Sequence, residues 1–250
     1  MDFLLIFLAC SLCIWAEVHA VPIISETENK TTINWKNDVV EDPKGRNFWT
    51  NPAQRWPKGR IPYVLSSEYS AADVKIIMDA MHEWSSKTCV RFTPKTPSDT
   101  SYVEITPNDG TSSYCYCHVG RRGGKQLMKM FGECMRPAAM IHEFGHLIGF
   151  NHEHQRPDRS DYITVHFGNI DPAFHFAFDQ FDRREVDALK MPYDFNSVMQ
   201  YPFFAFAKKY DKKRPSMTLK DGSIDAIFRE TEQLSQIDIL KTQLYFNNCR

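Results

Sequence analysis

The spacing of apolar residues along the chain separates helices from strands. Between Ser70 and Cys89, apolar residues recur every three or four positions, which predicts a helix with one buried face. Short segments rich in β-branched and aromatic residues predict strands instead. The predicted strands are IPYVL (61–65), VRFTP (90–94), YVEIT (102–106) and YCYCHV (114–119). The core-facing helix positions are Val74, Ile77, Met81 and Trp84.

Helix boundaries are marked by polar side chains that can cap them. Ser70 with Asp73, and Ser235 with Asp238, each have the spacing of a capping box. The second pair predicts a C-terminal helix through Leu244. Apolar residues at 138–141 and 147–148 predict a further, buried helix around a polar centre.

The N-terminus has the pattern of a targeting segment. Residues 3–15 form an almost unbroken apolar run of thirteen residues, whereas about 20 are needed to span a bilayer. The run ends in Glu17-Val18-His19-Ala20, a small-x-small cleavage pattern. We therefore expect a signal peptide over residues 1–20 and a secreted chain without a membrane anchor.

Residues 21–46 are polar and lack helical periodicity. Asn29 begins the sequence Asn-Lys-Thr, which predicts N-glycosylation in a surface segment. The segment ends at Gly45-Arg46, and composition alone leaves two interpretations: a flexible tail, or a propeptide that a protease removes after Arg46.

Composition narrows the functional class. With 30 Lys and Arg against 31 Asp and Glu, the formal charge is −1, so no basic field favours nucleic acid or an anionic membrane. Apolar residues at 42% exclude a disordered chain, and the mean hydropathy of −0.44 excludes a polytopic membrane protein.

Residues 142–152, HEFGHLIGFNH, carry the chemistry. His142 and His146 are four residues apart, so on a helix both imidazoles lie on one face and reach one zinc ion. Glu143 lies beside them, within reach of a water on that metal. Gly149 can adopt the left-handed conformation that ends the helix, after which His152 can turn back as a third ligand. His154 is the alternative third ligand, and the spacing favours His152.

The extended segment HEFGHLIGFNHEHQRPDR (142–159) resembles the zinc signature of the astacin family of metzincin endopeptidases. RWPKGRIPYVL, KTCVRF, HVGRRGG, RPDRSDYI and YDFNSVMQY also resemble landmarks of that family, so the resemblance covers residues 47–250. It implies an α+β zincin domain of two lobes. A twisted sheet with helices would form the N-terminal lobe, the zinc helix would lie at the cleft, and the C-terminal lobe would be less regular.

The resemblance implies roles for residues outside the motif. Met199 matches the methionine of the Met-turn beneath the zinc, and Tyr201 matches a tyrosine that lies over the metal and stabilises the oxyanion. Glu153 matches a buried glutamate that pairs with the α-amino group freed by activation. The family's His and Gly on either side of this tyrosine are replaced by Gln200 and Pro202.

Beyond the signal peptide, an odd number of cysteines remains, and their pairing is open from the sequence alone. The resemblance implies the disulfides Cys89–Cys249 and Cys115–Cys134, which leaves Cys117 free or intermolecular.

The family's propeptide places an aspartate on the zinc through an F-x-G-D segment. Trp35-Lys36-Asn37-Asp38 resembles this segment: an aromatic residue comes first and an aspartate last. Asn replaces the Gly, and Asn is among the few residues that tolerate the positive φ that Gly supplies. We interpret Asp38 as the latency switch and Asp42 as the alternative.

These features together predict a secreted zinc endopeptidase made as a zymogen, with one Zn²⁺ per chain. Glu143 would be the general base and Tyr201 the oxyanion stabiliser, acting on protein or peptide substrates in a monomer. The chain ends near Cys249, so no C-terminal recruitment domain is expected. The alternatives are a zinc-containing binding module without catalysis and a peptidase of another metal-dependent clan.

Overall fold

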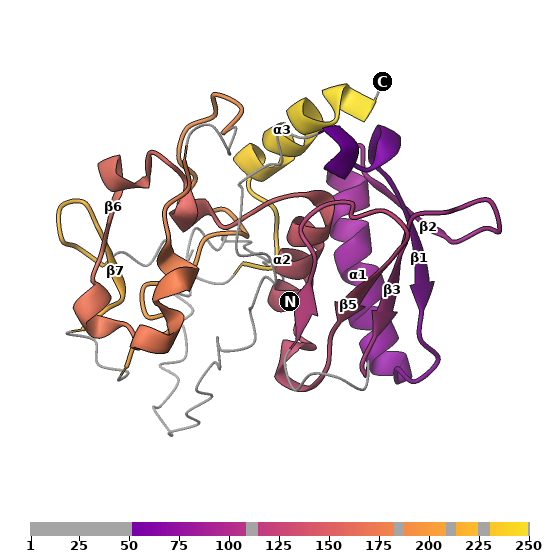
Figure 1. Ribbon diagram of the computed structural model, residues 1–250, viewed down its shortest axis with the longest axis horizontal. Helices are drawn as coiled ribbons and strands as arrows, with labels where there is room; N and C mark the ends of the chain where they lie inside the picture. The colour runs from indigo at the N-terminus through magenta and orange to yellow at the C-terminus, as the bar shows by residue number, and fades with distance from the viewer. Residues whose placement is uncertain (1–51, 109–114, 183–187, 209–213, 225–230, 250) are drawn as a thin grey trace, which may run out of the picture. The chain divides into compact units, whose positions relative to one another are not determined.

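The first half of the described chain forms a five-stranded sheet (Figure 1). The computed structural model describes residues 52–108, 115–182, 188–208, 214–224 and 231–249, which all belong to one unit, 33–250. The strands are β1 (Arg60–Leu65), β2 (Arg91–Pro94), β3 (Tyr102–Thr106), β4 (Tyr116–Cys117) and β5 (Lys125–Lys129). Their order is β2-β1-β3-β5-β4, and only β4 runs antiparallel to its neighbour.

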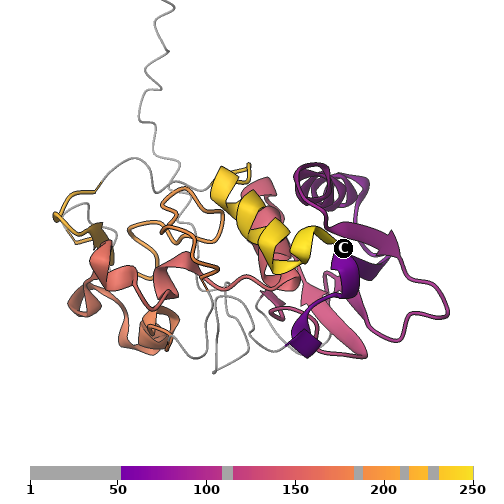
Figure 2. The ribbon, with the colours of Figure 1, turned by 90° about the horizontal axis from the view of Figure 1, so that it is seen from above.

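Helix α1 (Ala71–Lys87) connects β1 to β2, as a parallel pair requires. Ser70 and Asp73 form the predicted capping box at its first turn. Figures 1 and 2 show α1 along one face of the sheet, and its buried side chains include Ile77, Met81 and Trp84. Val74 is half-buried and packs against the same core.

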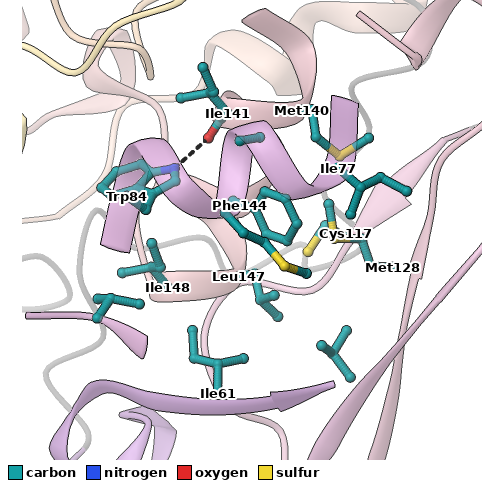
Figure 3. Close-up of a cluster of buried hydrophobic side chains, with 14 of the residues drawn as sticks. Ile61, Ile77, Trp84, Cys117, Met128, Met140, Ile141, Phe144, Leu147 and Ile148 are labelled. Atoms are coloured by element: carbon teal, nitrogen blue, oxygen red, sulfur yellow. Dashed lines mark hydrogen bonds between the residues drawn. The ribbon is translucent and has the colours of Figure 1, made fainter. Parts of the chain in front are cut away.

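Helix α2 (Pro137–Ile148) packs beside α1 in the main apolar core. Figure 3 shows Phe144 and Leu147 of α2 among side chains from the sheet and α1. The Trp84 indole N–H donates to the carbonyl of Ile141 at 2.9 Å, and the Trp56 indole donates to Leu147 O at 2.8 Å. These hydrogen bonds satisfy two buried indole N–H groups whose burial would otherwise be unfavourable. They also hold α2 in one orientation against Trp84 and Trp56.

After α2 the chain is less regular. It forms the two-stranded antiparallel sheet of β6 (Ile163–Val165) and β7 (Met217–Leu219), with a second apolar cluster around Phe178, Tyr201 and Phe206. Helix α3 (Gln236–Tyr245) follows, with the predicted Ser235–Asp238 capping box. The short 3-10 helices are Pro52–Gln54, Pro57–Gly59, Gly132–Cys134, Glu153–Gln155, Arg159–Asp161, Phe167–Asn169, Pro172–Phe178 and Asn247–Cys249.

Several elements differ from the sequence-based expectation. In the described part of YCYCHV, residues 115–119, only Tyr116 and Cys117 form a strand, and the sequence analysis did not predict β5, β6 or β7. The sequence of β5, KQLMK, has no β-branched or aromatic residue, and it becomes a strand because it pairs along its whole length with β3. Within the described residues, no helix is long and apolar enough to cross a membrane.

Two disulfides connect distant parts of this fold. Cys89, just after α1, bonds to Cys249, just after α3, and Cys115 bonds to Cys134. Both pairs are those that the family resemblance implied, and Cys117 is a buried free thiol. The sequence separations are 160 and 19 residues.

Removing each disulfide by a double Cys→Ser substitution should destabilise the chain unequally. Because the longer loop restricts the unfolded chain more, we expect a loss of about 5 kcal/mol for Cys89–Cys249 and about 3 kcal/mol for Cys115–Cys134. Urea unfolding of the two variants beside the parent protein measures this. An equal or reversed order would show that loop closure does not dominate.

Candidate active site

A proline at the start of α2 and a glycine after its last residue determine where the helix begins and ends. Pro137 occupies the first turn, where its missing N–H costs nothing. Gly149 follows the last helical residue with φ of 130°, and its N–H donates to Gly145 O and His146 O. A Cβ at Gly149 would lie 3.1 Å from the ring of Tyr245, so both conformation and space favour glycine. The turn redirects the chain toward the helix face it has just left.

Three imidazoles meet on that face. His142 Nε2 lies 3.1 Å from His146 Nε2 and 3.3 Å from His152 Nε2, and the third side of the triangle is 3.2 Å. Among the described residues, these histidines form the one cluster of three or more His, Cys, Asp or Glu side chains that could hold a metal ion together. The structure therefore brings together the three histidines that the motif singled out.

The outer nitrogens of the three rings determine what the centre can hold. His142 Nδ1 faces Val198 O at 2.6 Å, and His146 Nδ1 faces Phe150 O at 2.8 Å. Carbonyl oxygens only accept, so each Nδ1 carries the proton and each Nε2 presents a lone pair. His152 Nδ1 likewise faces the amide oxygen of Gln155 at 3.0 Å.

Three converging lone pairs repel one another unless a cation lies between them. Nitrogens bound to one tetrahedral zinc at 2.0–2.1 Å are about 3.3–3.4 Å apart, close to the observed triangle. Three neutral imidazoles also leave room for a fourth ligand, as catalytic zinc sites do. The donor set and its spacing therefore fit zinc.

Met199 lies directly beneath the zinc helix. It is fully buried, and a Cβ added to Gly145 would collide with its sulfur. Its N–H donates to Ser197 Oγ, and its carbonyl accepts from Glu153 N, both at 3.0 Å. The turn that carries Met199 thus packs against α2 at Gly145, and it hydrogen-bonds to Glu153, the residue after the third histidine.

Glu143 follows His142 on α2 and is buried. The buried thiol of Cys117 lies close enough to sense its charge: burial, and secondarily Glu143, raise the pKa of Cys117 well above its usual range. A thiol held protonated next to this carboxylate is a poor nucleophile and a poor metal ligand. Cys117 therefore acts as a small apolar core residue.

Tyr201 packs against the third ligand. Its ring centroid lies 4.3 Å from that of His152 and 4.1 Å from that of His154, with the His154 ring nearly parallel. His154 directs Nε2 to Ala177 O at 2.9 Å. The choice between His152 and His154 is thereby resolved by geometry: His152 joins the triad, and His154 stacks on Tyr201.

Glu153 anchors a buried charged network. Oε1 accepts from Arg156 Nη1 at 2.8 Å and from Asp194 N at 2.9 Å, and Oε2 accepts from Lys241 Nζ at 2.6 Å. Burial alone would lower the pKa of Arg156, but Asp158 and Glu153 outweigh it and raise that pKa.

The neighbouring carboxylates respond to burial in the opposite sense. Burial, reinforced by the charge of Asp194, raises the pKa of Asp238 to about 6. Burial also raises the pKa of Asp194, although a hydrogen bond from Ser235 opposes it.

Comparison with known proteins identifies the family. The sequence profile of the Astacin peptidase family matches residues 48–247. This chain belongs to the astacin family. Zinc metalloproteinase nas-8 of Steinernema carpocapsae is 40% identical over 207 residues, covering 81% of this chain and 47% of that protein. Its namesake in Caenorhabditis elegans is 36% identical over 210 residues, covering 82% and 50%.

A solved structure shares the fold. High choriolytic enzyme 1, a hatching-enzyme zinc protease of the medaka Oryzias latipes, superposes with a TM-score of 0.69 at 34% identity. The match covers 82% of this chain and 96% of that one. The predicted family, the α+β fold class and the zinc cofactor are confirmed. The chain spans about half the length of the nas-8 relatives.

Other predictions lie outside the described residues. These are the signal peptide (1–20), the propeptide (21–46), Asn29, Asp38 and Asp42. The α-amino group of Asn47, the expected partner of Glu153, lies there too. All of these stay predictions.

Sequence reasoning missed the residues that support the ligands. Gln155 and Lys241 hold His152 and its neighbour Glu153, yet each reads as an ordinary polar residue. The signal available for Lys241 was its i+3 spacing from Asp238, which places two charges on one face of α3.

Gly145→Ala tests the close contact between α2 and Met199. Alanine favours a helix by about 1 kcal/mol over glycine, but the collision should cost about 1–3 kcal/mol, so we expect net destabilisation and weaker zinc retention. Thermal unfolding and zinc content check this. Gly168→Ala, where a Cβ meets nothing within 4 Å, is the control and should behave as the parent protein. A more stable Gly145→Ala protein would show that the contact is loose.

Proposed function

We propose that this protein is a secreted zinc endopeptidase that cleaves protein substrates and is made as a zymogen. The observation that carries the proposal is the triangle of His142, His146 and His152, together with the buried carboxylate of Glu143 next to His142 on α2. Family membership and the named zinc proteinases among its relatives support it.

The chain's residues divide the chemistry between them. His142, His146 and His152 would hold a zinc ion, which would supply polarisation of the scissile carbonyl and a lower pKa for water. Glu143 takes the proton of the attacking water on its carboxylate and later passes it to the leaving amine. Tyr201 donates a hydrogen bond to the carbonyl oxygen as negative charge develops there. Met199 packs against Gly145 of α2, the helix that carries two of the three histidines.

Activation is proposed to follow removal of residues 1–20 by signal peptidase and cleavage after Arg46. Before that cleavage, the carboxylate of Asp38 would occupy the open position on the metal. Afterwards, the α-amino group of Asn47 would join Glu153. The active enzyme is proposed to be a monomer with no membrane anchor, and the sugar on Asn29 would leave with the propeptide.

Glu143→Gln should keep one zinc per chain and lose turnover, because glutamine preserves shape but takes no proton. We expect a rate reduction of roughly 10²–10⁴-fold. Gelatin hydrolysis by the full chain, activated by limited trypsin digestion, measures the rate, and metal analysis measures the zinc. Chelation should abolish parent activity, and added zinc should restore it.

The matched control is Glu133→Gln, which changes an exposed carboxylate outside α2 and should leave the rate unchanged. Full activity of Glu143→Gln would overturn the general-base assignment. A folded, zinc-loaded parent protein that never hydrolyses protein would instead favour a zinc-containing binding module.

Asp38→Ala in the uncleaved chain should raise basal activity, because the open metal position is then accessible to substrate. Asp42→Ala is the matched comparison and should stay latent. Activity of both proforms is measured before any protease is added. If only Asp42→Ala is active, the switch is Asp42, and if neither is active, latency has another cause.

A further inference from the structure

Helix α3 buries charged and polar side chains that a surface helix ordinarily exposes. Its buried residues are Asp238, Lys241, Thr242 and Tyr245, whereas Leu240 and Leu244 are 45% and 47% exposed. Burying charges is unfavourable unless each finds a partner. The partners that α3 finds lie in the segments that carry or orient the zinc ligands.

Asp238 holds the turn that carries Met199. Ser197 Oγ donates to Asp238 Oδ1 at 2.7 Å, and Val198 N donates to Oδ2 at 3.0 Å. The carbonyl of Val198 in turn accepts from His142 Nδ1 at 2.6 Å. One residue, Val198, therefore links α3 to the first ligand.

Lys241 reaches the segment of the third ligand. Its ammonium, on a side chain that is 3% exposed, lies 2.6 Å from Oε2 of Glu153, and Glu153 directly follows His152. The Glu153 N–H donates to Met199 O at 3.0 Å. The two oxygens of Glu153 thus connect α3, through Lys241, with Arg156 on the other side.

The end of α3 completes the set. Tyr245 packs against Gly149, where α2 ends, and Cys249 bonds to Cys89. Helix α3 therefore contacts the C-terminal end of α2, the segment that carries His152 and the turn that carries Met199. The disulfide joins the chain after α3 to the chain just after α1.

We propose that Lys241 is a positioning residue: through Glu153 it fixes the backbone that aims His152 at the metal. This rests on the proposed zinc peptidase function. The Lys241 ammonium bonds to Glu153 and not to a zinc ligand, so its influence on the metal passes through Glu153. Because the ion pair links residues 88 positions apart, it sets the geometry of the third ligand from a distant part of the chain.

Zinc release from the full chain tests this without relying on catalysis. Zinc-loaded proteins are mixed with excess chelator, and metal transfer is followed with time. We expect Lys241→Met to release zinc about tenfold faster than the parent protein, and Lys241→Arg to stay within about threefold of it. Tenfold is the lower end of the roughly 10–100-fold effect of losing a direct partner of a metal ligand, because Lys241 acts one residue further from the metal. Lys75→Met is the control, since it breaks an exposed ion pair with Asp79 and should release zinc at the parent rate.

A double-mutant cycle separates positioning from a general loss of structure. If Lys241 acts through Glu153, the double variant Lys241→Met/Glu153→Gln should release zinc no faster than the faster single variant. Multiplicative effects would overturn the proposal, and so would a parent rate in Lys241→Met. Should Lys241→Met fail to fold, Lys241→Gln, whose neutral and shorter side chain removes the ion pair with Glu153, is measured instead against the same limits.

Activity supplies a second readout. After trypsin activation, Lys241→Met should lower kcat with little change in KM, because a displaced His152 alters the metal and not the substrate subsites. Normal zinc release with no hydrolysis in the parent protein would count against the peptidase function alone. Fast release in Lys241→Met beside an active parent would support both.

Discussion

The mutual repulsion of three imidazole lone pairs is the constraint on which the site depends. His142, His146 and His152 present Nε2 atoms within 3.3 Å of one another because their Nδ1 atoms are committed to oxygen acceptors. Without those acceptors, a tautomer change could replace the repulsion with hydrogen bonds between the rings. The acceptors come from the turn at Val198 and from the stretch between Phe150 and Gln155, and such support fixes each ring and raises its basicity. The metal site is therefore as well ordered as the segments that meet behind it.

The charged network behind the site is costly to build and costly to break. Glu153, Arg156 and Lys241 are nearly inaccessible to water, so their desolvation offsets much of their attraction. Removing one member leaves the remaining buried charges uncompensated, which is strongly destabilising. Glu153 lies between the third zinc ligand and α3, where a unique arrangement matters most.

Features that depend on neighbours along the chain could be predicted before the fold was known. The spacing of His142, His146 and Gly149 follows from helical periodicity and from glycine's access to positive φ. The capping boxes of α1 and α3 are likewise local, because Ser and Asp three residues apart satisfy each other's backbone. Family resemblance added the disulfide pairs and the methionine beneath the zinc.

Long-range partners, in contrast, became visible only in the folded chain. Strand β5 owes its conformation to β3, and the collision of a Cβ at Gly145 with Met199 joins residues far apart in the sequence. Lys241 and Asp238 look like solvent-facing charges on a helix whose leucines would be expected inside, and the fold reverses that expectation. Periodicity reports which residues share a face. Which face is buried depends on the charges opposite it, and those are brought there by the rest of the chain.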